Sequence, residues 1–141
     1  KGKVQGIDYS AVSVEKARKV NASAIAAGRC AVQQASVAEL PFDAERFDVV
    51  TAFETVYFWP ELAQNFKEVY RVLKPGGAFF ICNEANGETA KDDKWTQIID
   101  GMTIYTDTDL KVYLEQAGFC KIQSYKNKKG WLCVTAQKAV K

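Results

Sequence analysis

The amino-acid sequence predicts an α/β fold whose mainly parallel sheet ends in an antiparallel hairpin. Strand-like and helix-like segments alternate over most of the chain, which is typical of a parallel sheet covered by helices. Near the C-terminus, two short apolar-alternating runs flank a turn that contains Gly130, as in a hairpin. The chain has 141 residues, 48% of them hydrophobic and 26% charged, which is ordinary for one globular domain. We therefore expect residues 1–141 to form a single domain.

The first half of the chain predicts three strands and one helix. Lys3–Tyr9 is expected to form the first strand. Ser10 can cap the helix that follows, and Gly28 can end it. The next strands are expected at Cys30–Val37 and Phe47–Glu54, and the second of these is apolar on both faces, as in a buried parallel strand.

The second half predicts a helix, a strand, a further helix and the hairpin. The first helix has Pro60 in its first turn and is stopped by Pro75-Gly76-Gly77. Asn86–Thr106 is the least regular stretch of the sequence. The other segments are a strand at Ala78–Asn83, a helix capped by the Thr106–Asp109 pair, and a hairpin within Lys121–Ala136.

Composition and charge argue against several classes of protein. With 19 basic and 17 acidic residues the net charge is only +2, and the one basic run, Lys126–Gly130, fits a turn, so no nucleic-acid partner is expected. No apolar run approaches the roughly 18 residues of a membrane span. The sequence shows no signal-peptide pattern before the first expected strand, and a cytoplasmic location is therefore expected. The chain has no histidine, which removes Ser-His and Cys-His pairs and any histidine base.

The four cysteines lack both the C-x-x-C spacing of metal ligands and the density of a disulfide scaffold. No metal site is therefore expected. We interpret the cysteines as buried, reduced thiols. They are Cys30, Cys82, Cys120 and Cys133.

Several segments, in their order and spacing, resemble the class I methyltransferases that use S-adenosylmethionine. The resemblance covers nearly the whole chain and is strongest over residues 4–84. It implies a Rossmann-like fold, S-adenosylmethionine as cofactor, and methyl transfer to a small-molecule acceptor. The C-terminal hairpin favours this family over flavodoxin-like and dinucleotide-binding folds. The segments are Lys3–Tyr9, Leu40-Pro41-Phe42, Phe47–Val50 and Arg71–Gly77, with a helix pattern after the first.

An acid at the end of the first strand is the first candidate cofactor residue. Asp8 is expected to point into the crevice where open α/β sheets bind ligands, and its carboxylate can accept hydrogen bonds from both ribose hydroxyls. NAD enzymes also bind ribose through an acid at this position, so Asp8 by itself does not distinguish methyltransferases from NAD enzymes. The alternative role is a helix cap formed jointly with Ser10.

The resemblance implies further cofactor contacts. Tyr9 is expected to lie against the adenosine. Ser36 stands where many family members have an acid that binds the adenine amino group, and the backbone N–H of Val37 can serve a ring nitrogen. Phe53 and Glu54 end the strand that faces the sulfonium and the acceptor, where an aromatic face or a carboxylate can stabilise a cation. Glu54 has the alternative role of capping a turn.

Acceptor contacts are expected from aromatic residues that follow strand ends. The candidates are Tyr57, Trp59, Trp95 and Tyr105. No catalytic residue can be named from the sequence. In-line methyl transfer depends mainly on positioning and the exclusion of water, so neither a histidine nor a metal is required.

The family has a strand and a glycine-rich loop before the acid-tipped strand, whereas this chain starts at Lys1. We therefore expect an N-terminally incomplete domain that is inactive by itself and has a gap in its sheet. Two unpaired edges there would favour closure of the strands on each other or self-association. Two alternatives stay open: a non-catalytic methyltransferase-like binding or assembly subunit, and another adenosine-binding enzyme such as a dehydrogenase.

Overall fold

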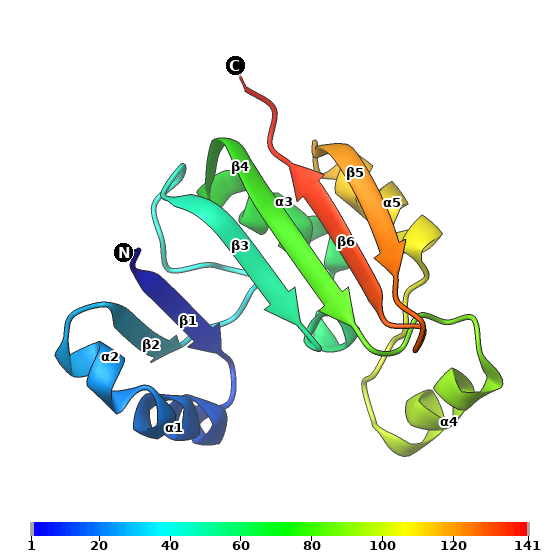
Figure 1. The fold of residues 1–141 in the computed structure, drawn as a ribbon, viewed down its shortest axis with the longest axis horizontal. Coiled ribbons are helices and arrows are strands. Elements are labelled where there is room, and N and C mark those ends of the chain that lie inside the picture. The colour runs from blue at the N-terminus through cyan, green and yellow to red at the C-terminus, as the bar shows by residue number, and fades with distance from the viewer. Residues whose placement is uncertain (1, 141) are drawn as a thin grey trace. The chain divides into compact units, whose positions relative to one another are not determined.

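The computed structural model describes residues 2–140 and divides the chain into two compact units (Figure 1). Unit 1 comprises Lys1–Pro41 and unit 2 comprises Phe42–Lys141. Both contain parallel strands, and unit 2 ends in an antiparallel hairpin. This architecture confirms the predicted fold class. The expectation of a single domain over the whole chain stays a prediction.

Unit 1 contains two parallel strands and two helices. Strand β1, Val4–Asp8, pairs with β2, Cys30–Gln34, so that Asp8 lies opposite Gln34 at the carboxyl end of both strands. Helices α1, Ala11–Val20, and α2, Ala22–Ala26, connect them. The second strand is three residues shorter than predicted, because the chain bends after Ala35 donates its N–H to the carbonyl of Asp8.

The predicted helix between Ser10 and Gly28 is interrupted. Ser10 caps α1 as expected, since its Oγ accepts the N–H of Ser13 at 3.3 Å. At Asn21 the backbone leaves the helical region, with φ −101° and ψ 16°, and the side chain donates to the carbonyl of Ala17 at 2.8 Å. Asparagine side chains compete in this way for backbone groups, which explains the break.

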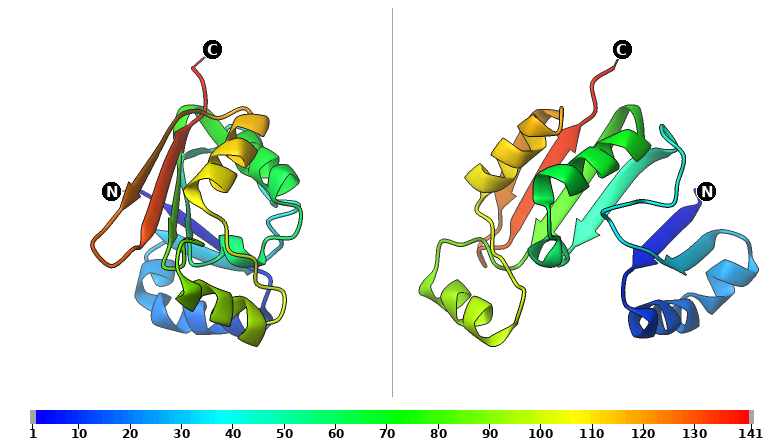
Figure 2. Two further views of the ribbon diagram at one scale, coloured as in Figure 1. Left: turned by 90° about the vertical axis from the view of Figure 1, so that its right-hand side faces the viewer. Right: turned by 180° about the vertical axis from the view of Figure 1, so that it is seen from behind.

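Unit 2 contains a four-stranded sheet in the order β3-β4-β6-β5. Strands β3 and β4 are parallel, and the other two pairs are antiparallel. Helices α3 and α5 lie side by side on one face of the sheet (Figure 2). The elements are β3, Phe47–Phe53; a short 3-10 helix, Val56–Phe58; α3, Leu62–Val72; β4, Leu73–Asn83; α4, Ala90–Ile98; α5, Asp107–Gln116; β5, Cys120–Lys126; and β6, Leu132–Gln137.

The hairpin prediction is confirmed. Strands β5 and β6 span the predicted range and extend one residue beyond it at each end. Their turn is closed by two backbone hydrogen bonds between Asn127 and its neighbours Gly130 and Trp131. The capping pair is confirmed as well, since Thr106 and Asp109 each accept the other's backbone N–H at the start of α5.

The boundary between α3 and β4 differs from the prediction. Instead of a stop at Pro75-Gly76-Gly77, the helix ends at Val72 and the strand begins at the next residue. The glycines belong to the strand because they pair with the chain after β6: Gly76 donates to the carbonyl of Lys138, and Lys138 donates to the carbonyl of Gly77, both at 2.9 Å. A Cβ at Gly77 would lie 2.9 Å from the carbonyl of Lys74, so only glycine fits there.

The core of unit 2 lies between the sheet and the two helices, and the opposite face of the sheet is more open. In the core, Phe66 and Phe79 are buried with their rings 5.5 Å apart. Val49 and Phe53 of β3 are each 56% exposed, so the expectation that Phe47–Glu54 is buried on both faces is wrong. Successive side chains point to opposite faces, and α3 and α5 cover only one of them.

The irregular stretch after β4 contains a helix that the sequence pattern did not predict. Helix α4 is positioned from its first turn, because the Asp92 carboxylate accepts the N–H groups of Asn86 at 3.2 Å and Gly87 at 2.8 Å. The turn is therefore held by side chains rather than by a periodic apolar face. No helix within residues 2–140 is long and apolar enough to cross a membrane.

Candidate functional site

In unit 1, Asp8 ends β1 and takes part in the cap of α1. Its Oδ1 accepts the N–H of Ser10 at 2.8 Å, and the side chain is half-buried. The alternative role as a cap is thus present in the structure. This cap uses only part of the hydrogen-bonding capacity of Asp8, because an ionised carboxylate has about four lone-pair sites on its two oxygens. Ribose binding by this side chain stays a prediction.

The other three residues proposed in unit 1 lie near the same strand ends. Tyr9 follows Asp8 and is 74% exposed, and its carbonyl accepts the side-chain amide of Gln34 at 2.9 Å. Ser36 and Val37 lie just beyond β2, the neighbour of β1. The Oγ of Ser36 accepts the N–H of Ala38 at 3.1 Å, which leaves its own O–H as a donor. The carboxyl end of this small sheet therefore gathers an acid, a hydroxyl and an exposed aromatic ring.

In unit 2, Phe53 and Glu54 lie at the carboxyl end of β3. The Phe53 ring is 56% exposed and packs against Phe80 at 5.8 Å. Glu54 has a φ of 55°, in the left-handed region that is costly for residues other than glycine. Its N–H donates to the carbonyl of Cys82 at 2.9 Å, and its Oε1 accepts the N–H of Glu84. Glu54 thus joins the ends of two parallel strands, which is the turn-capping role.

Tyr57 is a structural anchor for the loop after β4. It is only 3% exposed, and its hydroxyl oxygen accepts the N–H of Ala85 at 2.8 Å. The same oxygen lies 3.4 Å from Glu54 Oε1 and from the carbonyl of Ala85. Burial raises the pKa of Tyr57 well above its usual value, so the phenol is neutral near pH 7. The residue was proposed as an acceptor contact, and the structure places it inside unit 2 instead of on an open surface.

The other proposed acceptor residues divide into packed and exposed side chains. Trp59 stacks on Phe79 at 6.3 Å and meets Phe66 at 6.0 Å, so it extends the core. Tyr105 packs edge-to-face on Tyr113, and burial raises the pKa of Tyr105. Trp95, on α4, is 50% exposed. The acceptor role of these residues stays a prediction.

Sequence reasoning missed Phe58, which is the exposed aromatic ring in the run from Tyr57 to Trp59. Its side chain is 41% exposed, although its two neighbours are packed. Tyr57 and Phe58 end a 3-10 helix and Trp59 follows it. The rotation of each residue around the axis of this helix decides which ring faces outward. The sequence contains no signal for this choice, because all three residues are aromatic.

The hydroxyl of Tyr57 gives a stability prediction. Tyr57→Phe leaves the buried N–H of Ala85 without its acceptor, and we expect a loss of about 1–3 kcal/mol in the free energy of unfolding. Denaturant titration measures the change. The matched control is Tyr125→Phe, because Tyr125 is 55% exposed and its hydroxyl bonds only the exposed side chain of Gln123, so little change is expected. Equal stability of the two variants would show that the Tyr57 hydroxyl does not anchor this loop.

Parallel strand pairs in both units, an antiparallel C-terminal hairpin and an acid at the tip of β1 are together typical of the class I methyltransferase architecture. The methyltransferase domain family matches residues 1–81, which is more than half of the chain. The chain belongs to this family of S-adenosylmethionine-dependent methyltransferases. Family membership implies S-adenosylmethionine as the cofactor.

Curated relatives match part of their own length. The ubiquinone/menaquinone biosynthesis C-methyltransferase UbiE of Geotalea daltonii is 37% identical over 78 residues, which are 55% of this chain and 33% of the relative. The cycloartenol-C-24-methyltransferase of Arabidopsis thaliana is 30% identical over 125 residues, which are 82% of this chain and 37% of the relative. The chain therefore spans about a third of the length of these relatives.

Solved structures show the same fold at lower identity. A Haloferax volcanii structure, described as a complex between the Trm112 methyltransferase activator and a methyltransferase, has a TM-score of 0.85 and 20% identity, and covers 98% of this chain and 73% of the other. A Thermotoga maritima S-adenosylmethionine-dependent methyltransferase has a TM-score of 0.77 and 18% identity, and the match covers 95% of this chain and 72% of the other. At this identity the similarity concerns the fold.

Proposed function

We propose that this chain belongs to an enzyme that transfers the methyl group of S-adenosylmethionine to an apolar small-molecule acceptor. The observation that carries the proposal is the half-buried carboxylate of Asp8 at the carboxyl end of β1, within the segment that matches the family. The names of the relatives support the acceptor class, since they denote methyltransferases for quinones and sterols.

Each unit supplies its own contacts in this proposal. In unit 1, the free lone pairs of Asp8 accept the ribose hydroxyls, Tyr9 lies on the adenosine, and Ser36 and Val37 serve the adenine edge. In unit 2, Phe53 offers an exposed aromatic face to positive charge. Glu54 holds the strand ends in place through Glu84 and Cys82. The bound cofactor supplies an electrophilic methyl group.

The acceptor contacts are proposed from exposed or half-buried aromatic side chains. Phe58 and Trp95 offer apolar surface, and Tyr105 adds a neutral phenol. Tyr57 and Trp59 act on the acceptor only through packing, because both lie against the core. Such a surface suits a hydrophobic ring system better than a charged acceptor.

Open strand edges favour pairing with a further strand. Within residues 2–140, β1 pairs only with β2, and β3 pairs only with β4. Unpaired edges expose backbone donors and acceptors and are normally covered. We propose that a further strand, from a second copy or from another segment, pairs along one of these edges. This arrangement also suits the alternative function, a non-catalytic binding or assembly subunit.

Transfer of labelled methyl groups tests the function. The protein that contains this chain is incubated with methyl-labelled S-adenosylmethionine and an extract of quinones and sterols, and label is expected in an apolar product. The variant Trp95→Ala tests the acceptor surface, because it removes an exposed ring and should lower turnover more than cofactor affinity. Cofactor binding without transfer to any acceptor, together with concentration-dependent sedimentation, would instead support the assembly subunit.

A further inference from the structure

Two cysteines lie opposite each other on neighbouring strands of unit 2. Cys82 of β4 is the register partner of Cys133 of β6 in an antiparallel pair. Their sulfur atoms are 3.1 Å apart, and the thiol of Cys133 donates to Cys82 Sγ. Both thiols are free and half-buried. The two strands are far apart in sequence, so the pairing is a product of the tertiary structure.

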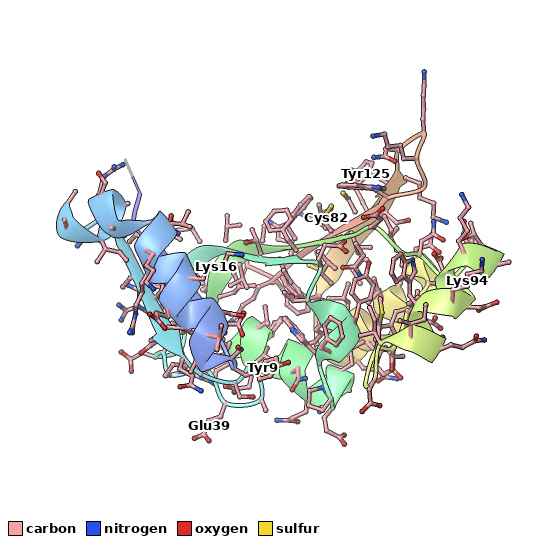
Figure 3. The ribbon with its side chains drawn as sticks, turned by 90° about the horizontal axis from the view of Figure 1, so that it is seen from below. Tyr9, Lys16, Glu39, Cys82, Lys94 and Tyr125 are labelled. Atoms are coloured by element: carbon pink, nitrogen blue, oxygen red, sulfur yellow. The ribbon has the colours of Figure 1, made fainter. Side chains whose placement is uncertain are left out.

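The thiol pair lies on the face of the sheet opposite α3 and α5. Their neighbours Ile81 and Val134 are 1% exposed and point to the helix-covered face, so the alternation of the strands turns the cysteines to the other face. Figure 3 shows Cys82 and Tyr125 on this same side of the sheet. Tyr125, the register partner of Cys133, is 55% exposed. A small reagent can therefore reach the sulfur atoms from this face.

The backbone geometry suits a bond between the two sulfur atoms. Directly opposed residues of an antiparallel pair have Cα atoms about 4.5–5.5 Å apart. Disulfides span Cα separations of about 4.4–6.8 Å. Cys82 and Cys133 therefore need only a side-chain rotation, and the hydrogen bonds of the β4–β6 ladder can be kept.

Within unit 2, Cys120 does not compete for this bond. The thiol of Cys120 donates to the carbonyl of Gln137 at 3.3 Å, and Gln137 is also its register partner. Gln137 is four residues beyond Cys133 on β6, which is a distance of about 13 Å along a strand. Cys30 lies in β2 of unit 1.

We propose that Cys82 and Cys133 are a redox modification site that forms a reversible intramolecular disulfide with a disulfide oxidant such as oxidised glutathione. One thiolate attacks the oxidant, forms a mixed disulfide and releases one glutathione. The second thiolate then attacks the protein sulfur and releases the second glutathione. The two cysteines lose two electrons and two protons, and these electrons and protons are found on the two reduced glutathione molecules.

The environment of the pair affects both steps. Burial and the contact with Cys133 raise the pKa of Cys82 to about 11, so little of this thiol is ionised near neutral pH. Once one of the two sulfur atoms carries glutathione, closure of the ring is favoured, because the other sulfur atom already lies beside it. The proposal does not depend on the methyltransferase activity.

Mass spectrometry after equilibration with oxidised glutathione tests the site. The Cys30→Ser/Cys120→Ser variant keeps only the proposed pair. It is expected to lose the mass of two hydrogen atoms, to become resistant to alkylation, and to recover both thiols with a dithiol reductant. Peptide mapping of the unchanged chain should show the same Cys82–Cys133 cross-link.

Single replacements in that background provide the control. Adding Cys82→Ser or Cys133→Ser leaves one thiol, which should accumulate a glutathione adduct instead of an internal bond. Two glutathione adducts on the double variant would overturn the proposal, as would full alkylation after saturating oxidant or a cross-link between chains. Retained far-ultraviolet circular dichroism shows that each variant is folded.

Discussion

Asp8→Asn is expected to weaken S-adenosylmethionine binding at least tenfold while leaving thermal stability nearly unchanged. The amide keeps an Oδ1 that can accept the N–H of Ser10, so the helix cap survives. It loses the charge and one acceptor oxygen that should serve the ribose hydroxyls. Hydrogen bonds to charged groups contribute about 1.5–3 kcal/mol each, and about 1.4 kcal/mol is already tenfold. Calorimetric titration with the cofactor measures the loss.

Ser10→Ala is the matched control for this prediction. It removes the Oγ that accepts the N–H of Ser13 and should cost about 1 kcal/mol of stability, as loss of an N-cap does. Cofactor affinity should be unchanged. The reverse pattern, in which Asp8→Asn unfolds the chain more easily but binds the cofactor normally, would show that Asp8 is only a cap.

Lys138→Met is expected to lower the free energy of unfolding by about 2–4 kcal/mol, because two hydrogen bonds from a buried charged donor are lost. Lys138 is 6% exposed, and its Nζ donates to the carbonyls of Tyr70 at 2.9 Å and Leu73 at 2.8 Å. Tyr70 is in the last turn of α3 and Leu73 is the C-cap residue that follows it, where a cation is also favoured by the helix dipole. Methionine keeps the length and apolar stem of the side chain, so the change isolates the ammonium group.

The control for Lys138 is Lys111→Met on α5. Lys111 is exposed and its ion pair with Glu115 is 3.9 Å long, so a change within about 0.5 kcal/mol is expected. Denaturant titrations of both variants measure the difference. If Lys138→Met were as stable as Lys111→Met, the contacts of the buried ammonium would be balanced by the cost of its desolvation.

Most of the fold could be predicted from the sequence, because its elements are defined by local patterns. Ser10 and the Thr106–Asp109 pair form the caps that their residue types predict. The hairpin around Gly130 forms where the turn residues stand between two alternating runs. Helix α4 could not be predicted, because its start is held by the Asp92 carboxylate on the N–H groups of Asn86 and Gly87, and no apolar periodicity marks it.

The candidate site was predicted less completely than the fold. The position of Asp8 at a strand end followed from the strand pattern, and the structure shows it there. The placement of the aromatic residues did not follow, since Tyr57 is buried and Phe58 is exposed. Which ring faces outward depends on the packing of Tyr57 against Ala85 and of Trp59 against Phe79, which are 28 and 20 residues away in sequence.

The sequence by itself determined the order of the strands, two of the helix caps, the hairpin turn and the acid at the tip of β1. Each of these depends on residues within a few positions of one another. Only the tertiary structure decided that Lys138 closes the end of α3, and that Cys82 meets Cys133. These contacts depend on strand register, and a shift of one residue turns every side chain of a strand to the other face.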